Sequence, residues 1–325
     1  MSETKDAWPL EVIESRVRII SDNDYSGDPD GLVQLAHHLL SPSVEVRAVI
    51  GTHLREGDPW NPSDDVVGDA VRAAQKIVDL CGMAGKVPVL AGAPAAMKDV
   101  NTPEESEGIR FIIDEAMRDD TTDPLYMVCG GSLTEIASAY LIEPRIADRL
   151  TVIWIGGTEH HGMAVPPPGA PDLEYNLHED VAAGLVFFNH SSLKLWQIPR
   201  DQYRQALVSR AELRLRMQPH GALGAHLYER LGRVALWLNE TRYKAGEVYC
   251  LGDSPLVLLT ALQNAFEPDT GSSKHVTVPC PTLLETGLYE ANPNGRPIRV
   301  YTLLDTRMMF EDLYAKLELH TGSSA

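Results

Sequence analysis

The sequence predicts an α/β fold in which an open, mostly parallel sheet is flanked by helices. Short apolar runs rich in β-branched residues alternate along the chain with longer stretches of helical spacing. Strands that alternate with helices are joined by crossover connections and therefore pair in parallel. The 325-residue chain is 44% hydrophobic and 23% charged, which provides enough apolar material for a sizeable core. We expect one domain over residues 1–325 rather than two small domains.

The first 200 residues supply most of the expected sheet. Residues 16–21 (RVRIIS) form the first expected strand, and apolar residues at helical spacing follow over 31–40. The second strand is expected over 44–51, and an amphipathic helix over 63–82 ends at Gly82. The later elements of this part of the chain alternate, with strands at 87–90, 125–129, 151–155 and 193–197 and helices at 105–118, 133–141 and 180–188. The segment Ser132–Glu135 has the spacing of a capping box and should begin the second of these helices.

The carboxyl-terminal third is mainly helical. Leucines at helical spacing over 209–243 predict long helices, which we interpret as a helical insertion at about 209–245. A short helix is expected over 254–263, a final strand over 299–304 and a closing helix over 306–317. In open parallel sheets, ligands bind at the carboxyl ends of the strands. The functional residues are therefore expected in the loops after Ile20, Ile50, Cys129 and Ile155.

The net charge of −18 excludes several classes of partner. It would repel phosphate backbones and anionic lipid, because binding to them depends on Lys and Arg, so we expect no nucleic-acid partner. No apolar run approaches the roughly 20 residues of a membrane span, and Met1 to Leu10 lack a signal-peptide pattern. The four cysteines form no C-x-x-C pair and are expected to be reduced and mostly buried. These features predict a cytoplasmic protein without membrane partners.

An Asp-rich loop follows the first expected strand. It carries four carboxylates, which are those of Asp22, Asp24, Asp28 and Asp30. So much negative charge at the end of a strand requires compensation, and a bound cation is the simplest form of it. Carboxylate oxygens suit Ca²⁺ or Mg²⁺ better than a soft transition metal. The alternative is a solvated turn in which the Asp side chains cap the following helix.

Two further segments combine carboxylates with other polar groups. Glu174 and Asn176 flank Tyr175, and in an extended segment their side chains would share one face and could hold sugar hydroxyls. The alternative is an ordinary surface strand edge. Asp253 stands ahead of Pro255 at the start of an expected helix, where it would either cap that helix or reach a cation in the same crevice.

Taken together, six segments resemble the nucleoside hydrolase family, in particular the inosine-uridine-preferring type, in order and spacing over most of the chain. The segments are 19–40, 87–94 (VPVLAGAP), 131–137 (GSLTEIA), 143–149 (EPRIADR), 174–176 (EYN) and 252–255 (GDSP). Each piece is short, and their common order makes the resemblance specific. The resemblance implies an open α/β fold with a Rossmann-like core, one bound Ca²⁺, and hydrolysis of the N-glycosidic bond of a ribonucleoside or related ribosyl compound.

The resemblance also implies roles for individual residues. Asp24 would bind Ca²⁺ and accept a proton from the attacking water, and Asp253 and the carbonyl of Gly130 would be further metal ligands. Asp28 and Asp30 would hold ribose hydroxyls or contribute to the metal site. Glu174 and Asn176 would clamp the sugar. The family also suggests a homodimer or homotetramer.

Departures from the family pattern point to a divergent branch. Gly31 stands where the family has a second adjacent Asp, Gly252 stands where it often has a His that protonates the leaving base, and an Asn common near Thr52 is absent. We select His53, after the second expected strand, as the substitute acid. The other candidates for this role are His160, His161, His178, Tyr243 and Tyr249. The alternatives to the hydrolase are a catalytically impaired sugar- or nucleoside-binding protein on the same fold and a metal-independent hydrolase of another sugar linkage.

Overall fold

The computed structural model describes residues 13–241, 243–264 and 271–323. The segment Met1 to Leu10, for which we expected no signal peptide, lies outside the described residues. Within the described residues, no helix is both long and apolar enough to cross a membrane. All four cysteines are free thiols, and three of them are buried, as the sequence predicts.

The centre of the molecule is an eight-stranded sheet in the order β3-β2-β1-β4-β5-β6-β12-β9. All neighbouring strands pair in parallel except β9, which is antiparallel to β12 at one edge. The strands are β1 (Val17–Asn23), β2 (Val44–Gly51), β3 (Val89–Ala91), β4 (Leu125–Cys129), β5 (Leu150–Ile155), β6 (Lys194–Ile198), β9 (Lys274–Pro279) and β12 (Pro297–Leu303). The open, mostly parallel sheet that the apolar runs predict is therefore confirmed.

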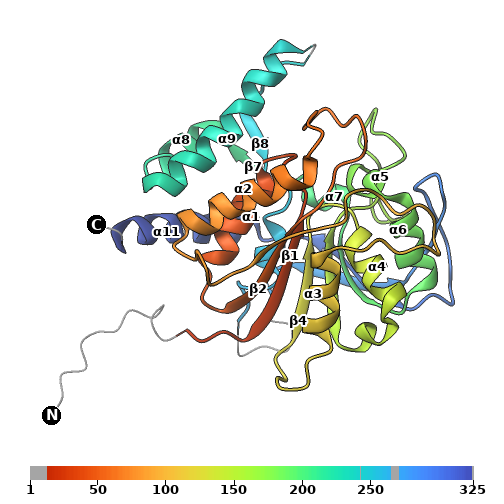
Figure 1. Ribbon diagram of the computed structural model, residues 1–325. Coiled ribbons are helices and arrows are strands. Elements are labelled where there is room, and N and C mark those ends of the chain that lie inside the picture. The colour runs from red at the N-terminus through yellow and green to blue at the C-terminus, as the bar shows by residue number, and fades with distance from the viewer. Residues whose placement is uncertain (1–12, 242, 265–270, 324–325) are drawn as a thin grey trace.

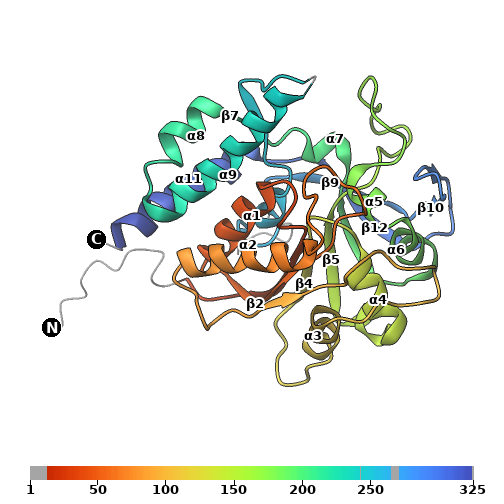
Figure 2. The same ribbon diagram turned by 45° about the horizontal axis from the view of Figure 1, so that its top comes forward.

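Helices cover both faces of this sheet (Figures 1 and 2). One layer consists of α1 (Asp30–Leu39), α2 (Val66–Leu80), α9 (Gly221–Glu240), α10 (Pro255–Leu258) and α11 (Thr306–Ser323). The other consists of α3 (Glu107–Ala116), α4 (Thr134–Ile142), α6 (Val181–Leu185) and a π-helical turn, η3 (Val186–His190). Successive residues of β1 point to opposite layers, because Ile19 packs with the first group and Ile20 with the second. Each layer thus has its own apolar core.

Several short elements surround this framework. They are η2 (Pro144–Asp148), α5 (Tyr175–Glu179), α7 (Arg200–Tyr203), α8 (Arg210–Arg216) and the small two-stranded sheets β7 (Leu207–Ser209) with β8 (Val248–Cys250) and β10 (Thr282–Leu283) with β11 (Tyr289–Glu290). The helical pattern over 209–243 corresponds to α8 and α9, which lie on the outer side of α1 and α2 (Figure 2).

The capping box expected at residues 132–135 is not formed. The cap of α4 is Leu133, which makes no side-chain capping bond. Glu135 turns away and accepts hydrogen bonds from Thr52 Oγ1 (2.8 Å) and the backbone N–H of Ala93 (2.8 Å). Its carboxylate therefore ties α4 to the loops after β2 and β3 instead of capping its own helix.

Candidate active site

An acidic cavity of about 240 Å³ opens at the carboxyl edge of the sheet. Its lining residues are Asp24, Asp28, Asp30, Trp60, Gly130, Ile155, Glu174, Tyr175, Asn176, Tyr203, Cys250, Gly252 and Asp253. The strand order explains its position. β1 lies between β2 and β4, so the chain leaves β1 in one direction along the sheet and returns to the other side of β1 at β4. The loops at such a switch point diverge and leave a crevice between them.

The loop after β1 places its carboxylates at this crevice. Asp24 and Asp30 are 5% and 8% exposed, and Asp30 is the first residue of α1. The backbone N–H of Gly27 donates to the carbonyl of Asp24 (2.6 Å), which closes the loop on itself. This is not the solvated turn of the alternative interpretation, because the side chains are buried and face one cavity.

Asp253, more than 220 residues later, joins the same group. Its carboxylate accepts from Asn23 Nδ2 (2.8 Å), and its backbone N–H donates to Asp30 Oδ2 (3.2 Å). The cap of α10 is Ser254 and not Asp253. Of the two roles that the sequence allows for Asp253, the structure shows the side chain at the crevice and not in a helix cap.

Glu174 and Asn176 line the cavity, but not for the reason expected from the sequence. The extended segment predicted there is wrong, because Glu174 caps α5 and Asn176 lies in its first turn. Glu174 Oε2 accepts from the N–H groups of Gly157 (2.8 Å) and Leu177 (3.1 Å). Asn176 Nδ2 donates to the carbonyls of Gly130 (2.9 Å) and Ile155 (2.7 Å). A helix start, and not strand alternation, brings the two side chains to one wall.

Burial and mutual repulsion dominate the electrostatics of the cavity. Burial, reinforced by Asp253, raises the pKa of Asp24 well above its usual value. Burial likewise raises the pKa of Asp253 to about 7 and that of Asp28 to about 6, and the hydrogen bond from Tyr249 (2.6 Å) limits the latter rise. Carboxylates this close cannot all ionise without nearby positive charge. The cluster therefore favours binding of a cation.

The available donor atoms suit a hard cation. They are carboxylate oxygens of Asp24, Asp30 and Asp253 and the carbonyl oxygen of Gly130, and oxygen ligands of this kind are those preferred by Ca²⁺. The buried Oδ1 of Asn23 has no hydrogen-bond partner among the described residues. Among the described residues, no three His, Cys, Asp or Glu side chains are arranged closely enough around one point to hold a metal ion. Asp30 and Asp253 instead direct an oxygen to a protein N–H.

Glycines allow the close approach of these segments. A Cβ on Gly130 would lie 2.2 Å from Asn23 Nδ2 and 2.8 Å from Asp253 Oδ2. A Cβ on Gly31 would lie 2.7 Å from Asn23 Nδ2, so a carboxylate at this position would displace Asn23. The glycine at position 31 thus leaves room for the Asn23 side chain, which donates to Asp253.

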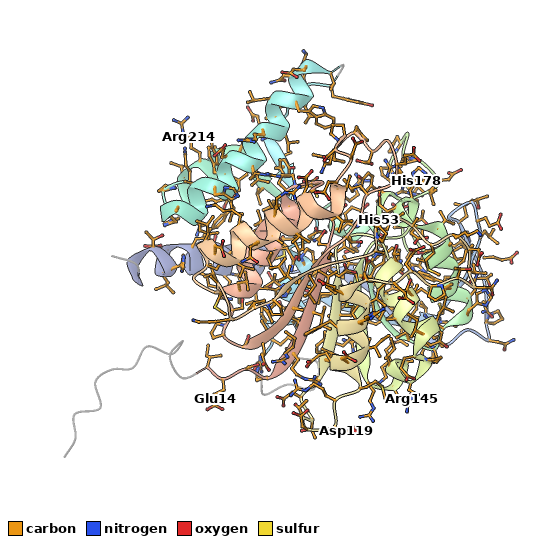
Figure 3. All side chains as sticks on the ribbon, in the orientation of Figure 1. Glu14, His53, Asp119, Arg145, His178 and Arg214 are labelled. Carbon is orange, nitrogen blue, oxygen red and sulfur yellow. The ribbon has the colours of Figure 1, made fainter. Side chains whose placement is uncertain are left out.

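The candidate acid His53 lies apart from this group. The residues described around the cavity do not include it, and its side chain is buried, with Nδ1 3.4 Å from Thr52 Oγ1. Figure 3 labels its place on the ribbon. A proton donor must reach the leaving group, so the geometry does not support this assignment. His178 is exposed on α5, and His160 and His161 line a different cavity. Tyr249 donates to Asp28 but is not among the residues described around the cavity, and Tyr243 is exposed.

Six lining residues were not expected as site residues from the sequence. They are Trp60, Ile155, Tyr175, Tyr203, Cys250 and Gly252. Tyr203 OH donates to Glu174 Oε1 (2.7 Å), and Tyr175 OH donates to Asp58 Oδ2 (3.0 Å). Trp60 and Tyr203 follow β2 and β6, so the rule that ligands bind after parallel strands could have identified both of them.

The chain is similar to known proteins over most of its length. Residues 19–311 match the family model described as inosine-uridine preferring nucleoside hydrolase. A protein of that name from Crithidia fasciculata is 28% identical over 221 residues, which are 59% of this chain and 62% of the relative. The match thus spans less than two thirds of that relative.

Solved structures show the same fold. A plant nucleoside hydrolase superposes with a TM-score of 0.69 at 15% identity, covering 93% of this chain and 99% of that one. The inosine-uridine preferring nucleoside hydrolase of Bacillus anthracis gives a TM-score of 0.66 at 16% identity, with coverage of 93% and 99%. At these identities the likeness concerns the fold alone.

Proposed function

The chain belongs to the inosine-uridine preferring nucleoside hydrolase family, and on that premise we propose that it hydrolyses the N-glycosidic bond of a ribonucleoside or related ribosyl compound with the help of Ca²⁺. The observation that carries the proposal is the convergence of Asp24, Asp30 and Asp253 with Glu174 and Asn176 on one cavity, from three separate stretches of the chain. Carboxylates at one wall and hydrogen-bonding side chains at another suit a sugar whose ring becomes positively charged.

In the proposed reaction, the bond between the sugar C1 and the base breaks, and the base leaves with the electron pair. The sugar passes through an oxocarbenium-like state, which the surrounding carboxylates stabilise. Water adds at C1, and Asp24 accepts its proton. The carboxylate of Glu174 and the remaining amide oxygen of Asn176 hold sugar hydroxyls, and they contribute most if these bonds tighten in the transition state.

Asp24, Asp30, Asp253 and the Gly130 carbonyl are the proposed ligands of Ca²⁺, with Asp28 as a further carboxylate close by. When bound, Ca²⁺ supplies positive charge that favours ionised carboxylates and the deprotonation of water. The raised pKa of Asp24 makes this charge necessary, because only an ionised Asp24 can act as a base.

The test is hydrolysis of p-nitrophenyl riboside and of common ribonucleosides by the purified protein with added Ca²⁺. Asp24→Ala should abolish release of ribose while the circular-dichroism spectrum stays that of the wild type. Turnover that survives in this folded variant would refute the role assigned to Asp24.

A ribosyl-binding protein without catalytic activity is the second candidate. It is favoured by one observation, namely that no histidine is among the described residues that line the cavity. Calorimetric binding of ribose without any hydrolysis of the substrates above would support this alternative.

We also propose a cytoplasmic homodimer or homotetramer. Four free cysteines support a reducing compartment, and the family resemblance supports self-association. Light scattering on the eluted protein measures the mass of the assembly directly.

A further inference from the structure

A second cavity, of about 200 Å³, adjoins the acidic one. Its lining residues are Ser26, Gly27, Pro29, Pro59, Trp60, Arg230, Arg233, Val234 and Trp237. Trp60 lines both cavities. The loop after β1 separates them, with its carboxylates on the acidic side and its uncharged residues on the other. The two cavities therefore meet at Trp60, where a group attached to a sugar in the acidic cavity would come next to the second one.

The second cavity has an aromatic wall. Trp60, from the loop after β2, and Trp237, near the end of α9, lie with ring centroids 5.1 Å apart and planes inclined by 41°. Both side chains are only partly buried, so each ring retains a face for another group. Indole faces of this kind bind flat aromatic rings by stacking.

The same cavity is positively charged, in contrast to a chain with a net charge of −18. Arg230 and Arg233 lie three residues apart on α9, and Arg233 pairs with Glu229 at 2.6 Å. Within the described residues, the guanidinium of Arg230 takes part in no ion pair or hydrogen bond. Burial, with the nearby Arg233, lowers the pKa of Arg230. The carboxylates of Glu229 and Asp69 oppose this shift, but neither makes a direct ion pair with Arg230. A partly buried cation without a direct partner is unfavourable, and an anionic ligand would supply one.

We propose that this second cavity binds the leaving group and selects a single-ring aromatic base that carries a carboxylate or similar anion. The inference rests on the proposed hydrolysis for its sugar subsite. The ring stacks on Trp60 or Trp237, and the anion pairs with Arg230. A cavity of about 200 Å³ is small beside the roughly 300–1,000 Å³ of a typical ligand pocket, so it suits a compact aromatic group.

The experiment uses two bases of nearly the same shape, nicotinate with a carboxylate and nicotinamide with an uncharged carboxamide in its place. Quenching of tryptophan fluorescence in the full-length protein reports the binding of each free base. Nicotinate should bind at least about tenfold more tightly, since one charge-assisted pair distinguishes them. Arg230→Gln should remove most of that preference. Arg214→Gln, at an exposed site on α8, should leave it unchanged (Figure 3).

Hydrolysis of the two corresponding ribosides separates this inference from the proposed function. The quantity to compare is kcat/KM for nicotinic acid riboside divided by kcat/KM for nicotinamide riboside. If this ratio falls at least about fivefold in Arg230→Gln, the inference is supported. Comparing the ratio between variants cancels the intrinsic reactivity of the two bases. Equal binding of the two bases, or a preference unaffected by Arg230→Gln, overturns it. If the protein binds nicotinate selectively but releases ribose from neither riboside, the anion-binding cavity is supported and the proposed hydrolase activity is refuted.

Discussion

Glu174 is the residue on which the sugar wall of the acidic cavity depends. One carboxylate oxygen accepts two backbone N–H groups and holds the start of α5, while the other accepts the hydroxyl of Tyr203. Three donors fix a side chain that is 1% exposed. A carboxylate held in this way can bind sugar hydroxyls without losing conformational freedom, which is the advantage of a preorganised site.

Removal of the Tyr203 hydroxyl should loosen Glu174 without emptying the site. We expect Tyr203→Phe to lower kcat/KM for ribosides by roughly tenfold, which is the effect of one lost hydrogen bond to a charged group. Tyr228→Phe, on α9 and outside the cavity lining, is the matched control and should keep wild-type kinetics. Steady-state kinetics decide the matter, and equal losses in the two variants would show that Tyr203 has no specific link to the site.

Residues that follow strand ends could be predicted, whereas residues that depend on packing between distant segments could not. Asp24, Asp30 and Asp253 were found because carboxylates at strand ends and helix starts are conspicuous in the sequence. His53 meets the same criterion, but its side chain is buried and is not among the residues described around the cavity. Nothing in the sequence indicates that Trp60 contacts Trp237, because that contact depends on how α9 lies against the loop after β2.

At the scale of elements, the site depends on the close approach of the ends of β1 and β4. The backbone N–H of Gly130 donates to the carbonyl of Asp22 (2.9 Å), and Asn23 occupies the space that a side chain at Gly130 would need. Gly130→Ala should therefore displace Asn23 and Asp253 together. A displacement of about 1 Å can reduce activity roughly a hundredfold, and we expect a loss of at least that size.

Gly232→Ala is the control for this substitution. Gly232 lies within α9, and a Cβ there meets no atom within 4 Å. Alanine is a better helix former than glycine, so this variant should gain roughly 0.5–1 kcal/mol of stability and keep its activity. Thermal unfolding and riboside hydrolysis are measured for both variants. Full activity in Gly130→Ala would show that the packing of Asn23 against Gly130 is not required.

The capping role of Glu174 can be separated from its proposed sugar contact. Glu174→Gln keeps an oxygen that accepts the N–H of Leu177, so the free energy of unfolding should change by less than about 1 kcal/mol. Glu174→Ala removes the cap of α5 and should cost about 1–2 kcal/mol. Both variants should hydrolyse ribosides poorly. Denaturant unfolding combined with kinetics tests this, and a Gln variant as active as the wild type would contradict the sugar contact.

Elements whose apolar residues form a clear pattern can be predicted from the sequence, whereas very short elements cannot. The strands β1, β2, β4, β5 and β6 were expected within a few residues of their bounds, because buried parallel strands are continuous apolar runs. The strands β7, β8, β10 and β11 have only two or three residues, which is too few to show an alternation of apolar and polar residues. The side chains of the edge strand β9 are largely exposed, so its sequence lacks an apolar run.

At the scale of the whole molecule, the acidic character of the chain becomes concentrated at one point. With a net charge of −18, the surface already repels additional negative charge, and the fold nevertheless buries Asp24, Asp30 and Asp253 around one cavity. Buried carboxylates cost free energy unless they are paired or bind a metal. The stability of the protein should therefore depend on a cation.

Calcium should raise the melting temperature, and a chelator should lower it. A ligand that binds only the folded state at a hundred times its dissociation constant stabilises by about 2.7 kcal/mol, which corresponds to roughly 4 °C for a chain of this size. Asp253→Asn keeps the shape of the side chain but removes one charge, so it should lose most of the calcium-dependent shift. Asp119→Asn, at an 83% exposed position distant from the cavity, should retain the whole shift (Figure 3). Differential scanning calorimetry with Ca²⁺, Mg²⁺ or chelator measures this without any substrate, and a melting temperature unaffected by all three would show that the buried carboxylates do not bind a cation.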